Sequence, residues 1–254
     1  RDYKVTGVQT CALPILGVRS DFRAGGVSVR LNASPFVGWY SGVQVPVSGL
    51  NTTAACGTGP GGSNPPRSSP DGDCIAANDP SGGTLLINAG KTRVAGIDLF
   101  GRIAPTRTLS FDAGATFLDL KSRSLTVPPF LVAYLASPQV PFNLVAKTTI
   151  TAGAHWTLPV PESIGTAVLG ADYYHSSKVQ SSDAVLPAYD LVNARFDLNG
   201  IAGTSLDAGV FVRNLFNKTY LASANVGSNL LGINSGFYGA PRTYGIELRY
   251  RFGQ

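Results

Sequence analysis

The last segment of the chain, residues 242–252, alternates between residues of opposite character. One set of alternate positions is apolar and contains Tyr244, Ile246, Leu248, Tyr250 and Phe252. The other set contains Thr243, Gly245, Glu247, Arg249 and Arg251. Successive side chains of a β-strand point to opposite faces, so this segment predicts a strand with one apolar and one charged face. The aromatic residues at both ends of the apolar set favour a strand that lies between lipid and a watery lumen.

The same alternation recurs after residue 16 and predicts about nine long strands. These expected strands cover residues 16–22, 27–40 with a continuation toward 47, 84–103, 109–119, 144–156, 166–177, 189–199, 206–220 and 242–252. Short turns are expected near residues 23–26, 105–107, 159–165 and 200–204, and long loops at 48–82, 121–137, 178–188 and 221–241. In an up-and-down sheet, all the short turns then lie at one end and all the long loops at the other. The sequence therefore predicts an all-β, antiparallel up-and-down transmembrane β-barrel with short periplasmic turns and long extracellular loops.

The polarity of the strand faces distinguishes this barrel from a secreted β-sandwich, whose strands also bury one face. The charged faces carry Asp98, Arg102, Asp112, Lys147, Asp197, Asp207, Arg213, Glu247, Arg249 and Arg251, whereas the apolar faces carry no charge. No apolar run approaches the length of about 18 residues that a membrane helix needs, so insertion into a membrane requires a barrel. The net charge of +5 comes from scattered Lys and Arg residues, which argues against nucleic-acid binding.

Cys56 and Cys74 bracket a segment rich in Gly, Pro, Ser and Asp that cannot form a core. We expect a disulfide between them, because a covalent link orders such a segment where packing does not. Two free thiols or a metal site are the alternatives, but the pair lacks the neighbouring His or Cys residues of a zinc site. We expect no metal and no cofactor.

The sequence offers little support for catalysis. His155 and His175 are the only histidines. His175 is followed by Ser176, but adjacent residues of a strand face opposite ways and do not share a proton easily. We therefore expect that the protein is not an enzyme.

Residues 1–15 resemble an in-frame translation of an adapter used in short-read DNA sequencing. The chain contains no Met. We therefore expect residues 1–15 to be a non-native, adapter-derived segment and exclude them from the fold prediction.

Several segments resemble TonB-dependent outer-membrane receptors. Residues 212–220 read Val-Arg-Asn-Leu-Phe-Asn-Lys-Thr-Tyr and residues 239–245 read Gly-Ala-Pro-Arg-Thr-Tyr-Gly, which together with the last strand are similar to the C-terminal signature of that family. Residues 88–91, 96–99 and Pro105 resemble a strand and turn in the middle of its barrel, and residues 190–195 resemble its antepenultimate strand. The resemblance covers essentially all of residues 16–254.

The resemblance implies a barrel of about 22 strands, closed by an N-terminal plug, that imports scarce ligands. The resemblance then implies that residues 16–254 are the C-terminal portion of the barrel, an incomplete barrel of about nine long strands without the plug and the earlier strands. The expected function is active transport across the bacterial outer membrane of a ferric siderophore or another large nutrient. The alternative is a passive pore or an adhesin-like surface protein. The expected partners are outer-membrane lipid, an unidentified extracellular ligand, the TonB complex through the missing N-terminal region, and the barrel assembly machinery.

The strand pattern and the resemblance together give expectations for particular residues. The apolar set from Tyr244 to Phe252 is expected to face lipid and to carry the assembly signal. Arg213, Glu247, Arg249 and Arg251 are expected to face the lumen, where they either line a wet interior or contact the plug. Ligand-binding residues are not assigned. Aromatic residues near strand ends are expected to contribute to interfacial girdles, with some facing the lumen instead: Trp39, Tyr40, Trp156, Tyr173, Tyr174, Tyr220, Tyr244 and Phe252.

Overall fold

The computed structural model describes residues 15–50, 83–125, 145–180, 185–225 and 235–252, with side chains described for all of these except 42–50, 83–90, 122–125, 225 and 235. The adapter-like residues 1–14 and the cysteine pair lie outside the described residues. The expected disulfide between Cys56 and Cys74 therefore stays a prediction.

The chain divides into two compact units. Unit 1 contains Arg1–Pro14, Val37–Val94 and Leu120–Asn143. Unit 2 contains Ile15–Phe36, Ala95–Asp119 and Leu144–Gln254, and it holds most of the described side chains. Three long strands pass through both units.

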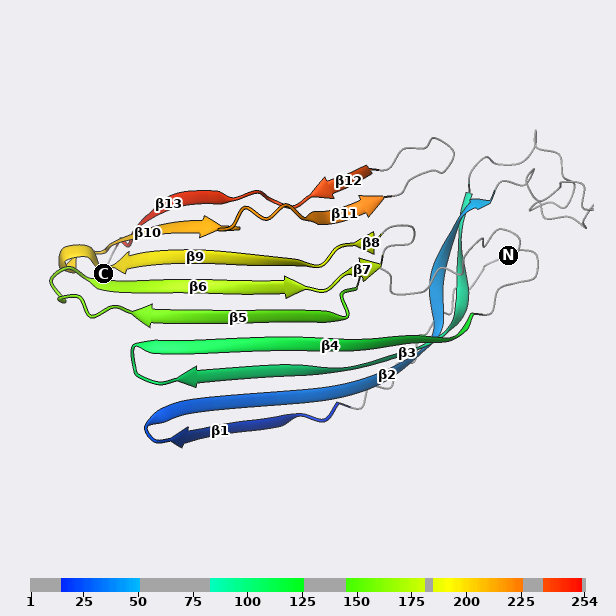
Figure 1. Cartoon of the computed structure of the whole chain (residues 1–254), viewed down its shortest axis with the longest axis horizontal. Coiled ribbons are helices and arrows are strands. Elements are labelled where there is room, and N and C mark those ends of the chain that lie inside the picture. Colours follow the sequence, from blue (N-terminus) through cyan, green and yellow to red (C-terminus); the bar gives the residue numbers. More distant parts are fainter. Residues whose placement is uncertain (1–14, 51–82, 126–144, 181–184, 226–234, 253–254) are drawn as a thin grey trace, which may run out of the picture. The chain divides into compact units, whose positions relative to one another are not determined.

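The fold is built on a nine-stranded sheet with the order β1-β2-β3-β4-β5-β6-β9-β10-β13 (Figure 1). Its strands are β1 (Val18–Ala24), β2 (Val27–Leu50), β3 (Gly83–Ala104), β4 (Leu109–Leu125), β5 (Thr148–Thr157), β6 (Thr166–Ser176), β9 (Tyr189–Asn199), β10 (Leu206–Arg213) and β13 (Thr243–Tyr250). Every strand pair with a described register is antiparallel. The antiparallel sheet predicted from the alternation is confirmed, with β1 and β13 as its edges.

Within unit 2, the four short turns lie at one end of the sheet (Figure 1). They join β1 to β2, β3 to β4, β5 to β6, and β9 to β10 through the short 3-10 helix Ile201–Gly203. The connections from β6 to β9 and from β10 to β13, which also belong to unit 2, leave from the opposite end of these strands (Figure 1). This arrangement agrees with the turn and loop pattern expected from the sequence.

Some strand limits predicted from the sequence were wrong. β10 ends at Arg213 rather than at residue 220, because the next residue has a left-handed backbone conformation, with a φ of 50° at Asn214. β4 continues to Leu125, into an expected loop. Two expected loops contain short hairpins, β7 (Val179–Gln180) with β8 (Val185–Leu186), and β11 (Leu221–Asn225) with β12 (Ser235–Tyr238).

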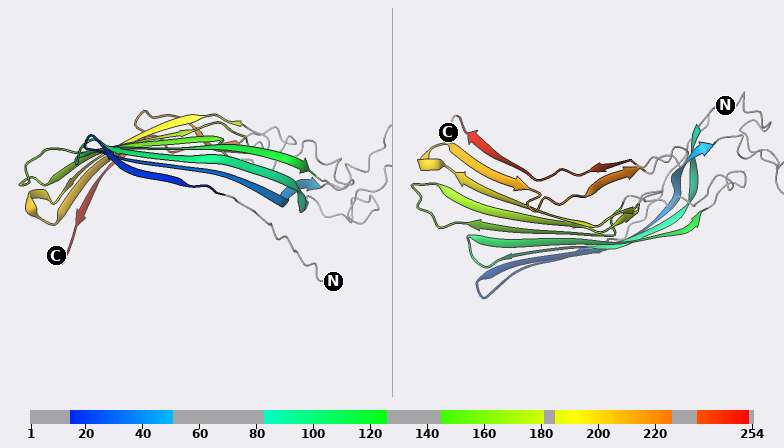
Figure 2. Two further views of the ribbon diagram at one scale, coloured as in Figure 1. Left: turned by 90° about the horizontal axis from the view of Figure 1, so that it is seen from below. Right: turned by 45° about the horizontal axis from the view of Figure 1, so that its top comes forward.

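The strands of unit 2 form one twisted layer (Figure 2). Among the described residues, the only buried hydrophobic side chains are Ala167 and Leu186. Many large apolar side chains are exposed to solvent instead, such as Ile246, which is 77% exposed, and Leu248, which is 71% exposed. A β-sandwich buries such a face against a second sheet, so this sheet does not match the sandwich alternative.

No helix in the described part of the chain has the length and apolar character needed to cross a membrane.

Candidate functional site

Cross-strand pairing sorts the side chains of β9, β10 and β13 onto two faces. Ile246 lies opposite Val210, which lies opposite Phe196, and these apolar residues share one face. On the other face, Glu247 lies opposite Gly209, which lies opposite Asp197. Directly opposed residues of antiparallel strands point to the same side of a sheet. We call the side with Glu247 and Asp197 the charged face, and the side with Ile246 the apolar face.

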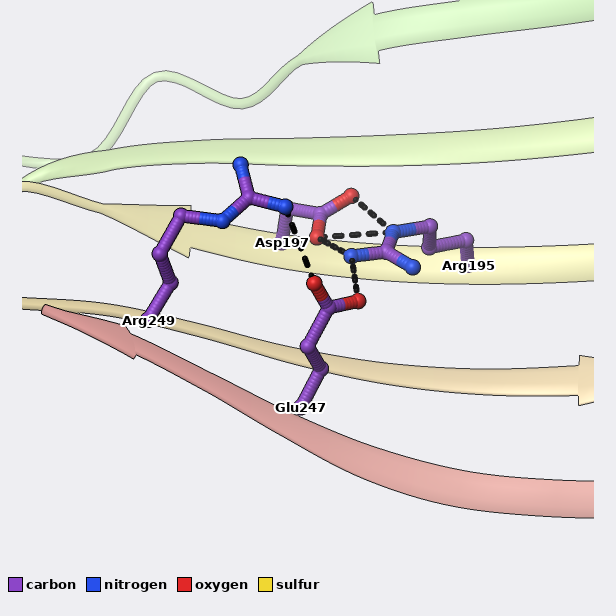
Figure 3. Close-up of polar contacts among 4 residues, drawn as sticks. All are labelled: Arg195, Asp197, Glu247 and Arg249. Carbon is purple, nitrogen blue, oxygen red and sulfur yellow. Dashed lines mark hydrogen bonds and ion pairs between the residues drawn. The ribbon is translucent and has the colours of Figure 1, made fainter.

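Four charged side chains of β9 and β13 contact one another on the charged face (Figure 3). Arg195 Nε donates to both carboxylate oxygens of Asp197 at 2.8 Å. Arg195 Nη2 donates to Glu247 Oε2 at 2.9 Å, and Arg249 Nη2 donates to Glu247 Oε1 at 2.9 Å. We call Arg195, Asp197, Glu247 and Arg249 the ionic network. Its two positive and two negative charges balance one another through ion pairs.

The ionic network joins two strands that are not neighbours, because β10 lies between β9 and β13. Gly209 occupies the intervening position on β10. A Cβ at that position would lie 2.6 Å from Asp197 Oδ1 and 2.9 Å from Arg195 Nη2. The absence of a side chain there lets Arg195 reach across β10 to Glu247, so the network ties the edge strand β13 to the body of the sheet.

A second ion pair lies near the short-turn end of the same strands. Arg251 Nη2 donates to Asp207 Oδ1 at 2.7 Å, and the backbone N–H of Gly200 donates to the same oxygen at 2.9 Å. Asp207 is 9% exposed. This carboxylate therefore joins the turn after β9 to the residue that follows β13.

The four residues expected to face the lumen do not form one cluster. Glu247 and Arg249 belong to the ionic network, and Arg251 pairs with Asp207. Arg213 lies apart at the other end of β10, with its guanidinium carbon 5.4 Å from the centre of the Phe211 ring. Their orientation toward a lumen stays a prediction.

Sequence reasoning missed Arg195 as the centre of the network. The signal was present in two motifs, Arg-x-Asp at residues 195–197 and Glu-x-Arg at residues 247–249. Residues two apart on a strand share a face, and the two motifs carry complementary charges. Their pairing depends on the register of three strands, which the sequence does not supply.

Charge reversal at the centre of the network is expected to destabilise the sheet modestly. Arg195→Glu places a third carboxylate beside Asp197 and Glu247, and we expect a loss of about 1 to 2 kcal/mol because the groups are partly exposed and screened. Urea unfolding of the whole receptor in detergent micelles measures the change. Arg213→Glu, outside the network, is the matched control and should cost less. The double variant Arg195→Glu with Glu247→Arg should recover part of the loss, and a double variant no more stable than Arg195→Glu would contradict the role of this contact.

The signature segment after β10 forms a buried polar anchor. Asn214 is 4% exposed, and its Nδ2 donates to the carbonyl oxygens of Lys218 and Ala240 at 2.9 and 3.0 Å. Its Oδ1 accepts the backbone N–H of Lys218 at 2.7 Å. The backbone N–H of Asn214 donates to Asn193 Oδ1 at 2.9 Å. We call these contacts the Asn214 anchor.

A second asparagine extends this connection. The backbone N–H of Arg242 donates to Asn217 Oδ1 at 3.0 Å. Together with the Asn214 anchor, this bond joins the end of β10 to β9 and to the start of β13. The signature motif therefore has a structural role in joining the last strands of the sheet.

The arrangement around His175 does not form a nucleophilic site. His175 Nδ1 lies 2.8 Å from Asp190 Oδ1, and the hydroxyl of Tyr173 donates to the same oxygen at 2.6 Å. These three side chains are on the apolar face, so the expectation that the apolar faces carry no charge is wrong at Asp190, whose carboxylate is instead bound by Tyr173 and His175. Ser176 is buried at 4% exposure and belongs to the opposite set of β6. In the described segments, no group of three or more His, Cys, Asp or Glu residues is placed to hold a metal ion.

The family assignment follows from comparison with known proteins. The family model described as TonB dependent receptor-like, beta-barrel matches residues 16–215. The chain belongs to this family. As a member of this family, it is an outer-membrane protein of a Gram-negative bacterium, and the family comprises receptors and transporters rather than enzymes. No curated protein sequence matches the chain.

Solved receptor structures share the fold of this chain. The ferric yersiniabactin uptake receptor FyuA from Yersinia pestis has a TM-score of 0.63 and 12% identity, over 96% of this chain and 30% of the receptor. BauA, the ferric preacinetobactin receptor from Acinetobacter baumannii, has a TM-score of 0.56 and 20% identity, over 95% of this chain and 29% of the receptor. The FrpB iron transporter from Neisseria meningitidis has a TM-score of 0.58 and 14% identity, over 95% of this chain and 31% of the transporter. The chain thus spans about a third of the length of these proteins.

Proposed function

We propose that residues 16–254 are the C-terminal portion of the barrel of a TonB-dependent transporter, and that residues 1–15 are not native to it. The observation that carries the proposal is a single-layer sheet with an uncovered apolar face, in a chain that matches the barrel family over residues 16–215. In an outer membrane, lipid covers such a face, and a charged face suits a wet interior.

The proposed cargo is a ferric siderophore. The support is the similarity in fold to FyuA, BauA and FrpB, which are a ferric yersiniabactin receptor, a ferric preacinetobactin receptor and an iron transporter. Another large nutrient is the nearest alternative. The energy for import would come from the TonB complex, through a region of the receptor outside this chain.

The apolar residues of β13 are proposed to contact lipid and, with Phe252, to form the signal for the barrel assembly machinery. Their exposures support this role, since Tyr244 is 82% exposed and Phe252 is 87% exposed. Large apolar side chains that are this exposed normally contact lipid or another protein in the cell. The charged face is proposed to line the interior.

Uptake of radioactive iron tests the proposed function. Cells that carry the whole receptor and are grown under iron limitation are expected to take up ferric siderophore in a TonB-dependent manner. Cells with the receptor gene deleted and cells without TonB are the two controls, and both should lose the uptake. Uptake that persists without TonB would instead support a passive pore, and growth unaffected by iron supply would argue against an iron cargo.

A further inference from the structure

Three tyrosines form a stack on the charged face of unit 2. The rings of Tyr189 and Tyr220 are stacked, with centroids 4.4 Å apart and planes 23° apart. The rings of Tyr174 and Tyr189 are tilted by 44°, with centroids 5.9 Å apart. Both distances lie within or close to the range for favourable aromatic pairs, about 4.5 to 7 Å. We call Tyr174, Tyr189 and Tyr220 the tyrosine stack.

The register places the tyrosine stack on the charged face rather than in a lipid-facing girdle. Tyr174 lies opposite Leu191, and Tyr189 lies opposite Ser176. On β9, Tyr189 and Leu191 belong to the same alternate set as Arg195 and Asp197. In the proposed transporter, these rings therefore face the interior, at the end of the sheet from which the longer connections leave.

One end of the tyrosine stack is closed by backbone. A Cβ at Gly239 would lie 1.9 Å from Cζ of Tyr220, so the Tyr220 ring rests directly against the Gly239 main chain. The N–H of Gly239 also donates to the carbonyl oxygen of Tyr220 at 2.9 Å. Tyr220 thus lies between Gly239 and Tyr189. Both faces of its ring are covered, so a further ring cannot stack on it.

The other end of the stack is Tyr174, which has small described neighbours on the β5 side of its ring. Tyr189 approaches Tyr174 from the β9 side. On the β5 side, the cross-strand partner of Tyr174 is Thr151. Beyond it lies Gly114 of β4, where Thr151 Oγ1 covers the position of the missing side chain, 2.8 Å from an ideal Cβ. Tyr174 is half-buried, and its cross-strand neighbours on this side, among the residues that the structure describes, are the small residues Thr151 and Gly114.

We propose that Tyr174 binds an aromatic ring of the transported ligand, which extends the tyrosine stack by one member. The proposal rests on the proposed transport function and adds a chemical class to it, because it selects cargo with aryl groups over cargo with alkyl groups. A ring held at Tyr174 pairs with a residue that is itself fixed by Tyr189, Tyr220 and Gly239. The site is therefore preorganised for a planar partner.

Three iron complexes with the same metal and the same donor atoms test this site. They are ferric tris(benzohydroxamate), ferric tris(cyclohexanecarbohydroxamate) and ferric tris(acetohydroxamate), which carry an aromatic ring, a saturated ring and a methyl group. Calorimetric titration of the whole receptor should show that the benzohydroxamate complex binds about fivefold to tenfold more tightly than either of the others, as expected for one aromatic pair. Equal binding of the three complexes, or no binding of any of them, would overturn the proposal.

Variants at the end of the stack separate ring recognition from folding. Tyr174→Leu should abolish the preference for the aromatic complex, whereas Tyr174→Phe should keep it. Tyr173→Leu is the matched control, since it removes a neighbouring ring from the opposite face and should leave the preference unchanged. A preference that survives Tyr174→Leu would assign the aromatic site elsewhere and overturn the proposal.

The iron uptake assay is run on the same strains, so the two proposals can fail separately. Uptake with equal affinity for the three complexes rejects the aromatic site and leaves iron transport in place. Absence of any TonB-dependent iron uptake rejects the transport function itself.

Discussion

Asn214→Ala is expected to lower the free energy of unfolding of the receptor by about 4 kcal/mol. The change removes a side chain that is 4% exposed and makes three hydrogen bonds with backbone groups of Lys218 and Ala240. It also leaves an alanine at a φ of 50°, a left-handed conformation that asparagine tolerates better than alanine. Urea titration of the receptor in detergent micelles, followed by the heat-modifiable mobility of the folded barrel, measures the loss.

Two further variants separate the causes of that loss. Asn214→Gly accepts the left-handed backbone but still lacks the hydrogen bonds, so it should recover only about 1 kcal/mol. Asn217→Ala is the matched control, because Asn217 is exposed, has a φ of 51° and makes a single described side-chain bond, to Arg242. If Asn214→Ala costs no more than Asn217→Ala, then the anchor does not hold the last strands together.

Ile246→Arg is expected to cost about 2 to 4 kcal/mol in a lipid environment. Ile246 lies in the middle of β13 and is 77% exposed within this chain, so no protein contact in the described residues explains a large loss. The penalty arises only if hydrocarbon covers the side chain and the guanidinium must enter it. Unfolding of the receptor in phospholipid vesicles provides the measurement.

The same substitution on the charged face is the control. Thr243→Arg places an arginine on β13 in the alternate set that contains Glu247, and we expect a change within about 0.5 kcal/mol, as for an ordinary wet surface. Equal costs for the two variants would refute the lipid-facing orientation proposed for the last strand. Together, the two variants test whether the apolar face of β13 contacts lipid. The open sheet supports that orientation, but its geometry alone does not test it.

The strands and the faces were predictable because alternation is local. On β9, the expected residues 189–199 agree with the observed Tyr189–Asn199. Successive side chains of a strand point to opposite faces, so the polarity of each residue indicates which face it occupies. The end of β10 was not predictable from alternation. The pattern continues to residue 220, but Asn214 gains a set of buried hydrogen bonds by leaving the strand, and those partners come from β9 and from the segment before β13.

The ionic network and the tyrosine stack were not predicted for the same physical reason. Arg195 and Glu247 lie 52 positions apart, and their contact depends on a glycine in a third strand. Tyr174 and Tyr220 were expected to contribute to an interfacial girdle unless they faced the lumen, and the register places the tyrosine stack on the charged face. Charge complementarity and aromatic content are visible in a sequence, but strand register decides which of these groups meet.

The Asn214 anchor and the Asn217 bond close the chain at residues 214–218 against residues 240–242, at the base of the segment that carries the β11–β12 hairpin. Each of the two bonds across this closure pairs an asparagine side chain with a backbone group, of Ala240 or of Arg242, so neither bond uses a side chain of the segment between residues 218 and 240. We therefore expect insertions and replacements in that segment to leave the pairing of β9, β10 and β13 unchanged. In the proposed receptor, such a closure would let a new surface loop arise in few mutational steps, and the loop could then evolve faster than the strands that it joins.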